Sequence, residues 1–144
     1  LNPSSAASDV YKRQDMDLAR DESKNNPYFY AQYAYVRCCS ILAKAKYDPK
    51  EEVDLSEISN CFEIVSKAIN YPHFLKEYAL ERSPHSLVHF IKEFSADFHS
   101  FYESSPVISD NKAVSNSRLL ITLITKQILK NSFKILNVEP LEKM

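Results

Sequence analysis

The chain of 144 residues contains no glycine. Phosphate-binding loops and dinucleotide fingerprints need glycine because the backbone must approach the phosphates closely, so the sequence has no nucleotide cradle of these types. Tight β-hairpins also rely on glycine, whereas a helix can end on asparagine in the left-handed conformation. The lack of glycine therefore favours an all-α fold.

Long apolar runs and paired cysteine motifs are also lacking. No stretch of eighteen apolar residues occurs, so we expect no membrane span. The three cysteines form no CxxC motif and are read as reduced thiols, which suits a cytoplasmic protein. His85, His89 and Glu93 have helical spacing, but no further strong ligand accompanies them, so we expect no metal. No motif supports a catalytic residue either.

The apolar pattern predicts a helical bundle of about five helices. Pro27 and Pro84 follow Asn26 and Ser83, which are good helix N-caps, and Asn137 is suited to a left-handed C-cap. Apolar residues at helical spacing complete the assignment. The expected helices span residues 27–46, 56–69, 72–81, 84–104 and 114–136, with Phe62, Ile69, Leu123 and Ile124 among the residues expected to face inward.

The first long helix has unusual chemistry. Tyr30, Tyr33 and Arg37 recur on one face, where tyrosine and arginine can stack on nucleic-acid bases. Gln32 can hydrogen-bond to base edges. The alternative interpretation is an ordinary amphipathic helix whose tyrosines pack inward. A basic stripe on the last helix, Lys126, Lys130 and Lys134 with Arg118, could hold phosphates or could be a solvated face.

Four sequence motifs resemble those of one family. Residues 26–37, NPYFYAQYAYVR, resemble the signature NPxxYxQYAxxR of arginyl-tRNA synthetases. Residues 98–102, FHSFY, residues 126–131, KQILKN, and the ending PLEKM resemble three further family motifs in the same order. The resemblance covers residues 15–144 and implies the C-terminal all-α DALR anticodon-binding domain. Residues 1–14 do not resemble the family, and we expect a foreign or disordered leader there.

The resemblance implies an RNA partner and a set of contact residues. The partner is the anticodon stem-loop of tRNA(Arg), whose central C is the natural target because arginine codons share a middle G. Some positions depart from the family: Glu103 replaces a frequent Asn, and Lys126 replaces Arg. The residues that the resemblance and the basic stripe assign to tRNA binding are Tyr30, Tyr33, Arg37, Tyr102, Lys126, Lys130 and Met144.

The resemblance also implies a larger parent enzyme. Arginine–tRNA ligases use ATP and Mg²⁺, but the HIGH-like and KMSK-like active-site motifs are absent from this sequence. We therefore expect a non-catalytic, monomeric domain without a cofactor of its own, which serves an absent N-terminal catalytic domain. Two alternatives stay open: a helical protein–protein interaction module, and the anticodon-binding domain of a cysteinyl or glycyl synthetase.

Overall fold

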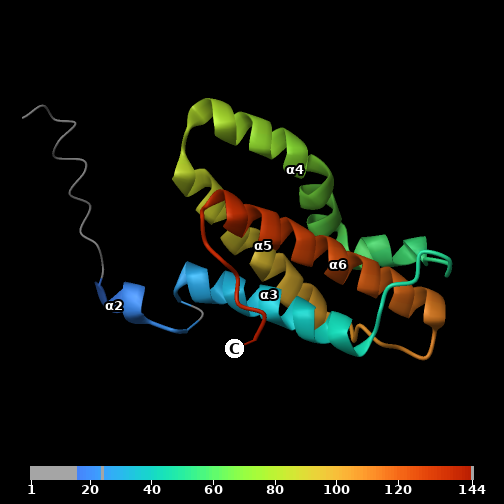
Figure 1. The fold of residues 1–144 in the computed structure, drawn as a ribbon. Helices are drawn as coiled ribbons and strands as arrows, with labels where there is room; N and C mark the ends of the chain where they lie inside the picture. Colours follow the sequence, from blue (N-terminus) through green and yellow to red (C-terminus); the bar gives the residue numbers. More distant parts are fainter. Residues whose placement is uncertain (1–15, 24, 144) are drawn as a thin grey trace, which may run out of the picture.

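The computed structural model describes residues 16–23 and 25–143, and within them the chain folds into helices without strands (Figure 1). Four long helices form the bundle, rather than the expected five. The leader predicted at residues 1–14 and the predicted contact residue Met144 lie outside the described residues. In chain order the elements are α2 (Met16–Arg20), α3 (Pro27–Lys44), the 3-10 helix η1 (Leu55–Cys61), α4 (Phe62–Glu81), α5 (Pro84–Ser104) and α6 (Lys112–Ile135).

Side-chain caps fix where α3 and α6 begin. The Asn26 side chain accepts a hydrogen bond from the Tyr28 amide at 3.0 Å, and Pro27 occupies the first turn of α3 as expected. Asn111 caps α6 by accepting from the amides of Ala113 and Val114. These bonds satisfy amides that have no partner within the helix, so both helices begin at defined residues.

Pro72 does not end a helix, which corrects the sequence-based boundary. Helix α4 continues through it, and Figure 1 shows that α4 bends along its length. A proline inside a helix removes one backbone hydrogen bond and commonly kinks the helix. Aromatic packing on both sides of the proline offsets this cost, because Tyr71 and Phe74 both stack on Phe90 of α5, with ring centroids 5.4 and 4.6 Å apart.

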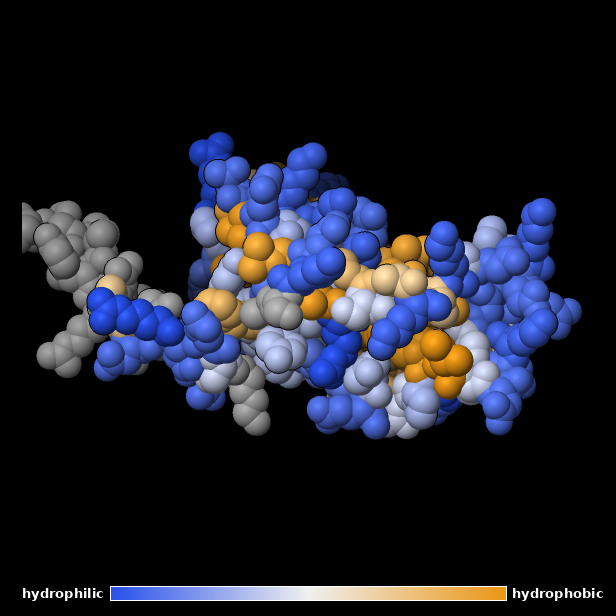
Figure 2. Space-filling model, turned by 60° about the horizontal axis from the view of Figure 1, so that its bottom comes forward, coloured by the Kyte–Doolittle hydropathy of each residue, from blue (hydrophilic) through white to orange (hydrophobic). Residues whose placement is uncertain are grey.

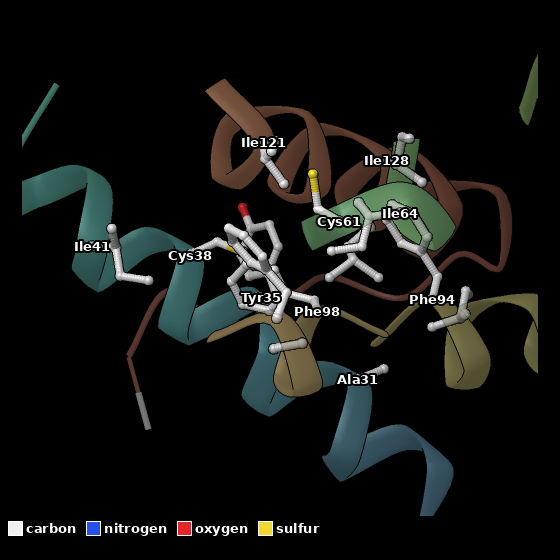
Figure 3. Packing of buried hydrophobic residues seen from close by; sticks show 14 of the residues in the cluster. Ala31, Tyr35, Cys38, Ile41, Cys61, Ile64, Phe94, Phe98, Ile121 and Ile128 are labelled. Carbon is white, nitrogen blue, oxygen red and sulfur yellow. The ribbon is translucent and has the colours of Figure 1, made fainter. Parts of the chain in front are cut away.

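The core lies where α3, α4, α5 and α6 meet, with Tyr35 and Phe98 near its middle (Figure 3). The predicted inward faces of α4 and α6 are partly wrong. Phe62 and Ile69 are 61% and 74% exposed, and Leu123 and Ile124 also reach the surface. Thr125 is buried instead, because its hydroxyl donates back to the Ile121 carbonyl and so leaves no unpaired polar group.

Two helices end on residues in the left-handed conformation. Asn137 has φ 56°, which confirms the expected cap, and the Val138 amide donates to the Phe133 carbonyl at 2.9 Å as in a Schellman motif. Arg82 ends α4 with φ 52°. Asparagine tolerates this conformation, whereas in arginine the close contact between Cβ and the following carbonyl oxygen destabilises the folded state.

We expect Arg82→Gly to raise the free energy of unfolding by about 0.5–1 kcal/mol. Removing Cβ relieves about 1–2 kcal/mol of strain in the folded state. Glycine also raises the conformational entropy of the unfolded chain, which lowers the net gain by about 0.5–1 kcal/mol. Urea denaturation measures the change. Arg82→Ala is the control because it removes the charge but keeps Cβ, and an equal gain in this variant would contradict the strain argument.

Candidate nucleic-acid interface

Helix α3 carries three of the seven candidate residues and has neighbours on two sides. It packs against α5 on one side and α6 on the other. Figure 2 views the molecule from the side of α3 and shows hydrophilic and hydrophobic side chains intermixed on this face. Tyr33 is 52% exposed and lies on the α5 side, where it lines a hollow together with His99 and Glu103. The interpretation in which every tyrosine of this helix packs inward is therefore wrong for Tyr33.

On the α5 side, Arg37 and Tyr102 are in direct contact. The Arg37 guanidinium carbon lies 4.5 Å from the centroid of the Tyr102 ring, within the range of a cation–π interaction. Both side chains are half-buried. The pair therefore presents a positive charge on an aromatic ring that α5 holds in place.

Tyr30 and Tyr33 line one hollow of about 490 Å³, which we call the tyrosine hollow. Its other lining residues are Glu22, Ser23, Phe29, His99 and Glu103. The rings of Tyr30 and His99 are 4.7 Å apart, and His99 Nε2 lies 3.4 Å from the Tyr30 carbonyl oxygen. This hollow is large enough to receive an unstacked base between aromatic side chains.

Burial and nearby charges set the protonation states of Tyr30 and His99 in the tyrosine hollow. Burial, and then the charges of Glu103 and Asp97, raise the pKa of the Tyr30 hydroxyl, so it stays a hydrogen-bond donor at neutral pH. Burial lowers the pKa of His99, which favours the neutral ring. The carboxylates of Glu22 and Glu103 make the hollow unfavourable for phosphate, but they can accept hydrogen bonds from an amino group.

The lysines of the predicted basic stripe lie on the α6 side of α3. Lys126 Nζ is 5.9 Å from the centroid of the Tyr35 ring. Lys130 lines a second hollow of about 430 Å³, which we call the lysine hollow. The lysine hollow is also lined by Tyr35, Lys134, Asn137, Val138, Glu139, Pro140 and Glu142. The predicted contact residues within the described part of the chain thus form two groups. Tyr30, Tyr33, Arg37 and Tyr102 lie on the α5 side of α3, and Lys126 and Lys130 lie on the α6 side.

Arg118 does not belong to the basic surface, which corrects its place in the predicted stripe. Its Nε donates to Glu57 Oε2 at 2.6 Å, and its Nη1 donates to the Pro106 carbonyl at 2.5 Å. Only 13% of the Arg118 side chain is exposed. This guanidinium therefore connects η1, α6 and the loop after α5 instead of facing a ligand.

Two further residues of the NPxxYxQYAxxR motif have roles that the sequence did not predict. Gln32, whose side chain could have served base edges, is fully buried, and its Nε2 donates to the Leu141 carbonyl at 3.0 Å. Tyr35 is also buried and packs edge-on against Phe133 with ring centroids 6.3 Å apart. Burial raises the pKa of Tyr35 to about 12. The only sequence signal was that both residues flank the apolar face containing Ala31, Ala34 and Cys38.

The described residues contain neither a candidate membrane span nor a candidate metal site. Within residues 16–23 and 25–143, no helix has the length and apolar character required to cross a bilayer. The same part of the chain brings together no three side chains suited to holding a metal ion. His89 Nε2 instead lies 3.2 Å from Glu93 Oε1 on the surface of α5.

The sequence is similar to curated arginine–tRNA ligases. It is 36% identical over 141 residues to the arginine–tRNA ligase of Nitrosospira multiformis, covering 95% of this chain and 24% of that protein. It is 33% identical over 138 residues to the arginine–tRNA ligase of Burkholderia ambifaria, covering 90% and 23%. The chain thus spans about a quarter of the length of these relatives.

The fold is similar to solved structures of the same kind. A putative arginyl-tRNA synthetase from Campylobacter jejuni superposes with a TM-score of 0.77 at 24% identity, over 91% of this chain and 29% of that one. The Thermus thermophilus arginyl-tRNA synthetase gives 0.73 at 24% identity, over 85% and 22%. The profile of the DALR anticodon binding domain matches residues 31–144, so this chain belongs to the DALR anticodon-binding domain family.

Proposed function

We propose that this domain binds the anticodon stem-loop of tRNA(Arg), as the anticodon-reading part of an arginine–tRNA ligase. The observation that carries the proposal is the DALR match over residues 31–144. The names of the curated relatives point to arginine as the amino acid. The match covers α3 from residue 31 onward together with all of α5 and α6, and so includes every candidate contact residue except Tyr30.

Each group of residues has a distinct part in the proposal. Tyr33 and Tyr30 offer aromatic faces for unpaired anticodon bases, and Arg37 on Tyr102 adds a guanidinium that can stack or pair with phosphate. Lys126 and Lys130 attract the backbone phosphates of the stem from the other side of α3. Met144 keeps its proposed role at the RNA surface from the family resemblance.

The carboxylates in the tyrosine hollow favour a particular kind of base. Glu103, which stands where the family often has asparagine, can accept a hydrogen bond from an exocyclic amino group. Cytosine carries such a group at N4, whereas uracil has a carbonyl oxygen at the same position. The hollow therefore suits the central C of an arginine anticodon better than the corresponding U.

The remaining parts of the proposal concern the whole enzyme. A catalytic domain elsewhere in the ligase would join arginine to the tRNA with ATP and Mg²⁺. The present domain would contribute tRNA recognition and no catalytic residue. We further propose that the ligase works in the cytoplasm and that this domain acts as a monomer.

Fluorescence anisotropy with labelled RNA tests the proposal. We expect the chain to bind a stem-loop with an arginine anticodon and to bind the same stem-loop less tightly when the central C is changed to U. One lost base contact is worth about 1–3 kcal/mol, which is roughly a five- to hundredfold change in Kd. Equal binding of both RNAs at moderate salt would contradict anticodon reading, and no binding to either would favour the protein-interaction alternative.

A further inference from the structure

The C-terminal segment after α6 crosses α3, and one buried side chain holds it there. After the turn at Asn137, the chain leaves the end of α6 and passes across α3 (Figure 1). Val138 still packs against the core. Beyond it, residues 139–143 make one hydrogen bond to the bundle within the described part of the chain, from Gln32 Nε2 to the Leu141 carbonyl.

Gln32 is an unusual residue to find in this place. Its side chain is fully buried on α3, 109 positions away in sequence from its partner. Its Oε1 has no hydrogen-bond partner, although burying an unpaired amide oxygen costs free energy. A methionine of similar length would fill the same space without that cost, so core stability alone does not account for glutamine here.

We propose that Gln32 is a positioning residue, which fixes residues 139–143 across α3 and so places them beside the proposed phosphate-binding lysines. The expected effect of Gln32 on RNA binding rests on the proposed function. The segment passes Tyr35 and borders the lysine hollow, because Glu139, Pro140 and Glu142 line that hollow together with Lys130. While Gln32 binds the Leu141 carbonyl, Glu139, Pro140 and Glu142 keep fixed positions relative to Lys130.

The Gln32→Met variant isolates the hydrogen bond from the packing. Methionine keeps the length of the side chain, removes the donor to Leu141 and removes the unpaired Oε1. We therefore expect a midpoint of urea denaturation equal to or above that of the wild type. The Leu141 carbonyl can turn to water, since Leu141 is 52% exposed.

Backbone ¹⁵N relaxation measures the position of the segment without RNA. In the wild type we expect order parameters at Leu141 and Glu142 close to the rigid value of about 0.85, and in Gln32→Met a fall below about 0.6. Ser132→Ala is the matched control. Ser132 is equally buried, and its hydroxyl is hydrogen-bonded to Tyr71 of α4 at 2.8 Å rather than to residues 139–143. This control should leave the order parameters at 141 and 142 unchanged.

A double-mutant cycle connects the segment to RNA binding. Gln32→Met should weaken binding of the arginine stem-loop roughly fivefold, as expected for the loss of one net hydrogen bond. In a chain that ends at residue 140, the same substitution should have no further effect, because the acceptor is already gone. A similar loss in both backgrounds would show that Gln32 acts through α3 itself and would overturn the inference.

The two readouts separate the inference from the proposed function. Unchanged order parameters in Gln32→Met would overturn the positioning role, whatever the RNA does. If the wild type binds no stem-loop, the proposed function fails along with the placement at an RNA surface, and relaxation still decides whether Gln32 holds the segment.

Discussion

Glu57→Ala is expected to lower the free energy of unfolding by about 3 kcal/mol, the lower end of the range for breaking a buried ion pair. The Glu57 carboxylate and the Arg118 guanidinium are 9% and 13% exposed and 2.6 Å apart. Removing the carboxylate leaves a nearly buried positive charge whose one remaining hydrogen-bond partner among the described residues is the Pro106 carbonyl. Chemical denaturation with a fluorescence or circular dichroism readout measures the loss.

A second ion pair in the same chain provides a matched control. Lys67 Nζ lies 2.6 Å from Asp97 Oδ2, the same separation, but these side chains are 27% and 23% exposed. Solvent screens this pair more strongly, so Asp97→Ala should cost about 1 kcal/mol or less. An equal loss in the two alanine variants would show that burial does not determine the difference.

The double variant Glu57→Leu with Arg118→Met tests the cause of the loss. Replacing both charges with apolar side chains of similar size removes the unpaired charge, so stability should return to within about 1 kcal/mol of the wild type. If the double variant is as unstable as Glu57→Ala, the loss comes from packing between η1 and α6 rather than from the charge.

Local signals in the sequence were sufficient to predict many of the helix boundaries. Asn26 with Pro27 set the start of α3, and Asn137 set the turn after α6, because caps depend only on neighbouring backbone groups. The start of α5 at Pro84 was likewise predicted. Pro72 gave the wrong boundary because stacking of Tyr71 and Phe74 on α5, a tertiary effect, overrides the preference of proline to end a helix.

The inward face of α6 was harder to predict, for a chemical reason. Apolar periodicity assumes that serine and threonine face water, yet Thr125 and Ser132 of α6 are fully buried with their hydroxyls hydrogen-bonded. Each such residue shifts the apparent apolar face of α6, so Leu123 was placed in the core although it lies on the surface.

For the candidate site, periodicity groups residues by their face of α3 but cannot identify the neighbours of each group. Arg37 meeting Tyr102 and Lys126 meeting Tyr35 depend on which helices flank α3. The burial of Gln32 depends on a segment more than a hundred positions away. Contacts of this range follow from topology, which a single sequence does not specify.

The Tyr33→Ala variant is expected to bind the arginine anticodon stem-loop roughly tenfold or more weakly than the wild type. Stacking of a base on an aromatic side chain is worth about 1–3 kcal/mol, and Tyr33 is the most exposed tyrosine of α3. Because its ring is 52% exposed, its removal should change the unfolding midpoint little. Anisotropy titration measures the affinity, and circular dichroism checks the fold.

Two variants show whether the loss is specific to a base. Tyr28→Ala removes another tyrosine of the same helix, one that packs edge-on against Phe133, and should leave the affinity nearly unchanged. Lys130→Ala should weaken binding to all stem-loops alike and reduce the slope of log K against log salt by about one, as loss of a phosphate contact requires.

Measuring the Tyr33→Ala and Lys130→Ala variants with stem-loops that carry C or U at the central position distinguishes base stacking from phosphate binding. If Tyr33 stacks on the central base, Tyr33→Ala should reduce the preference for C over U at that position, while Lys130→Ala should keep the preference and lower both affinities. The two groups of residues lie on opposite sides of α3, so their effects on binding free energy should add. A folded Tyr33→Ala variant that binds the arginine stem-loop as tightly as the wild type would rule out stacking at this residue.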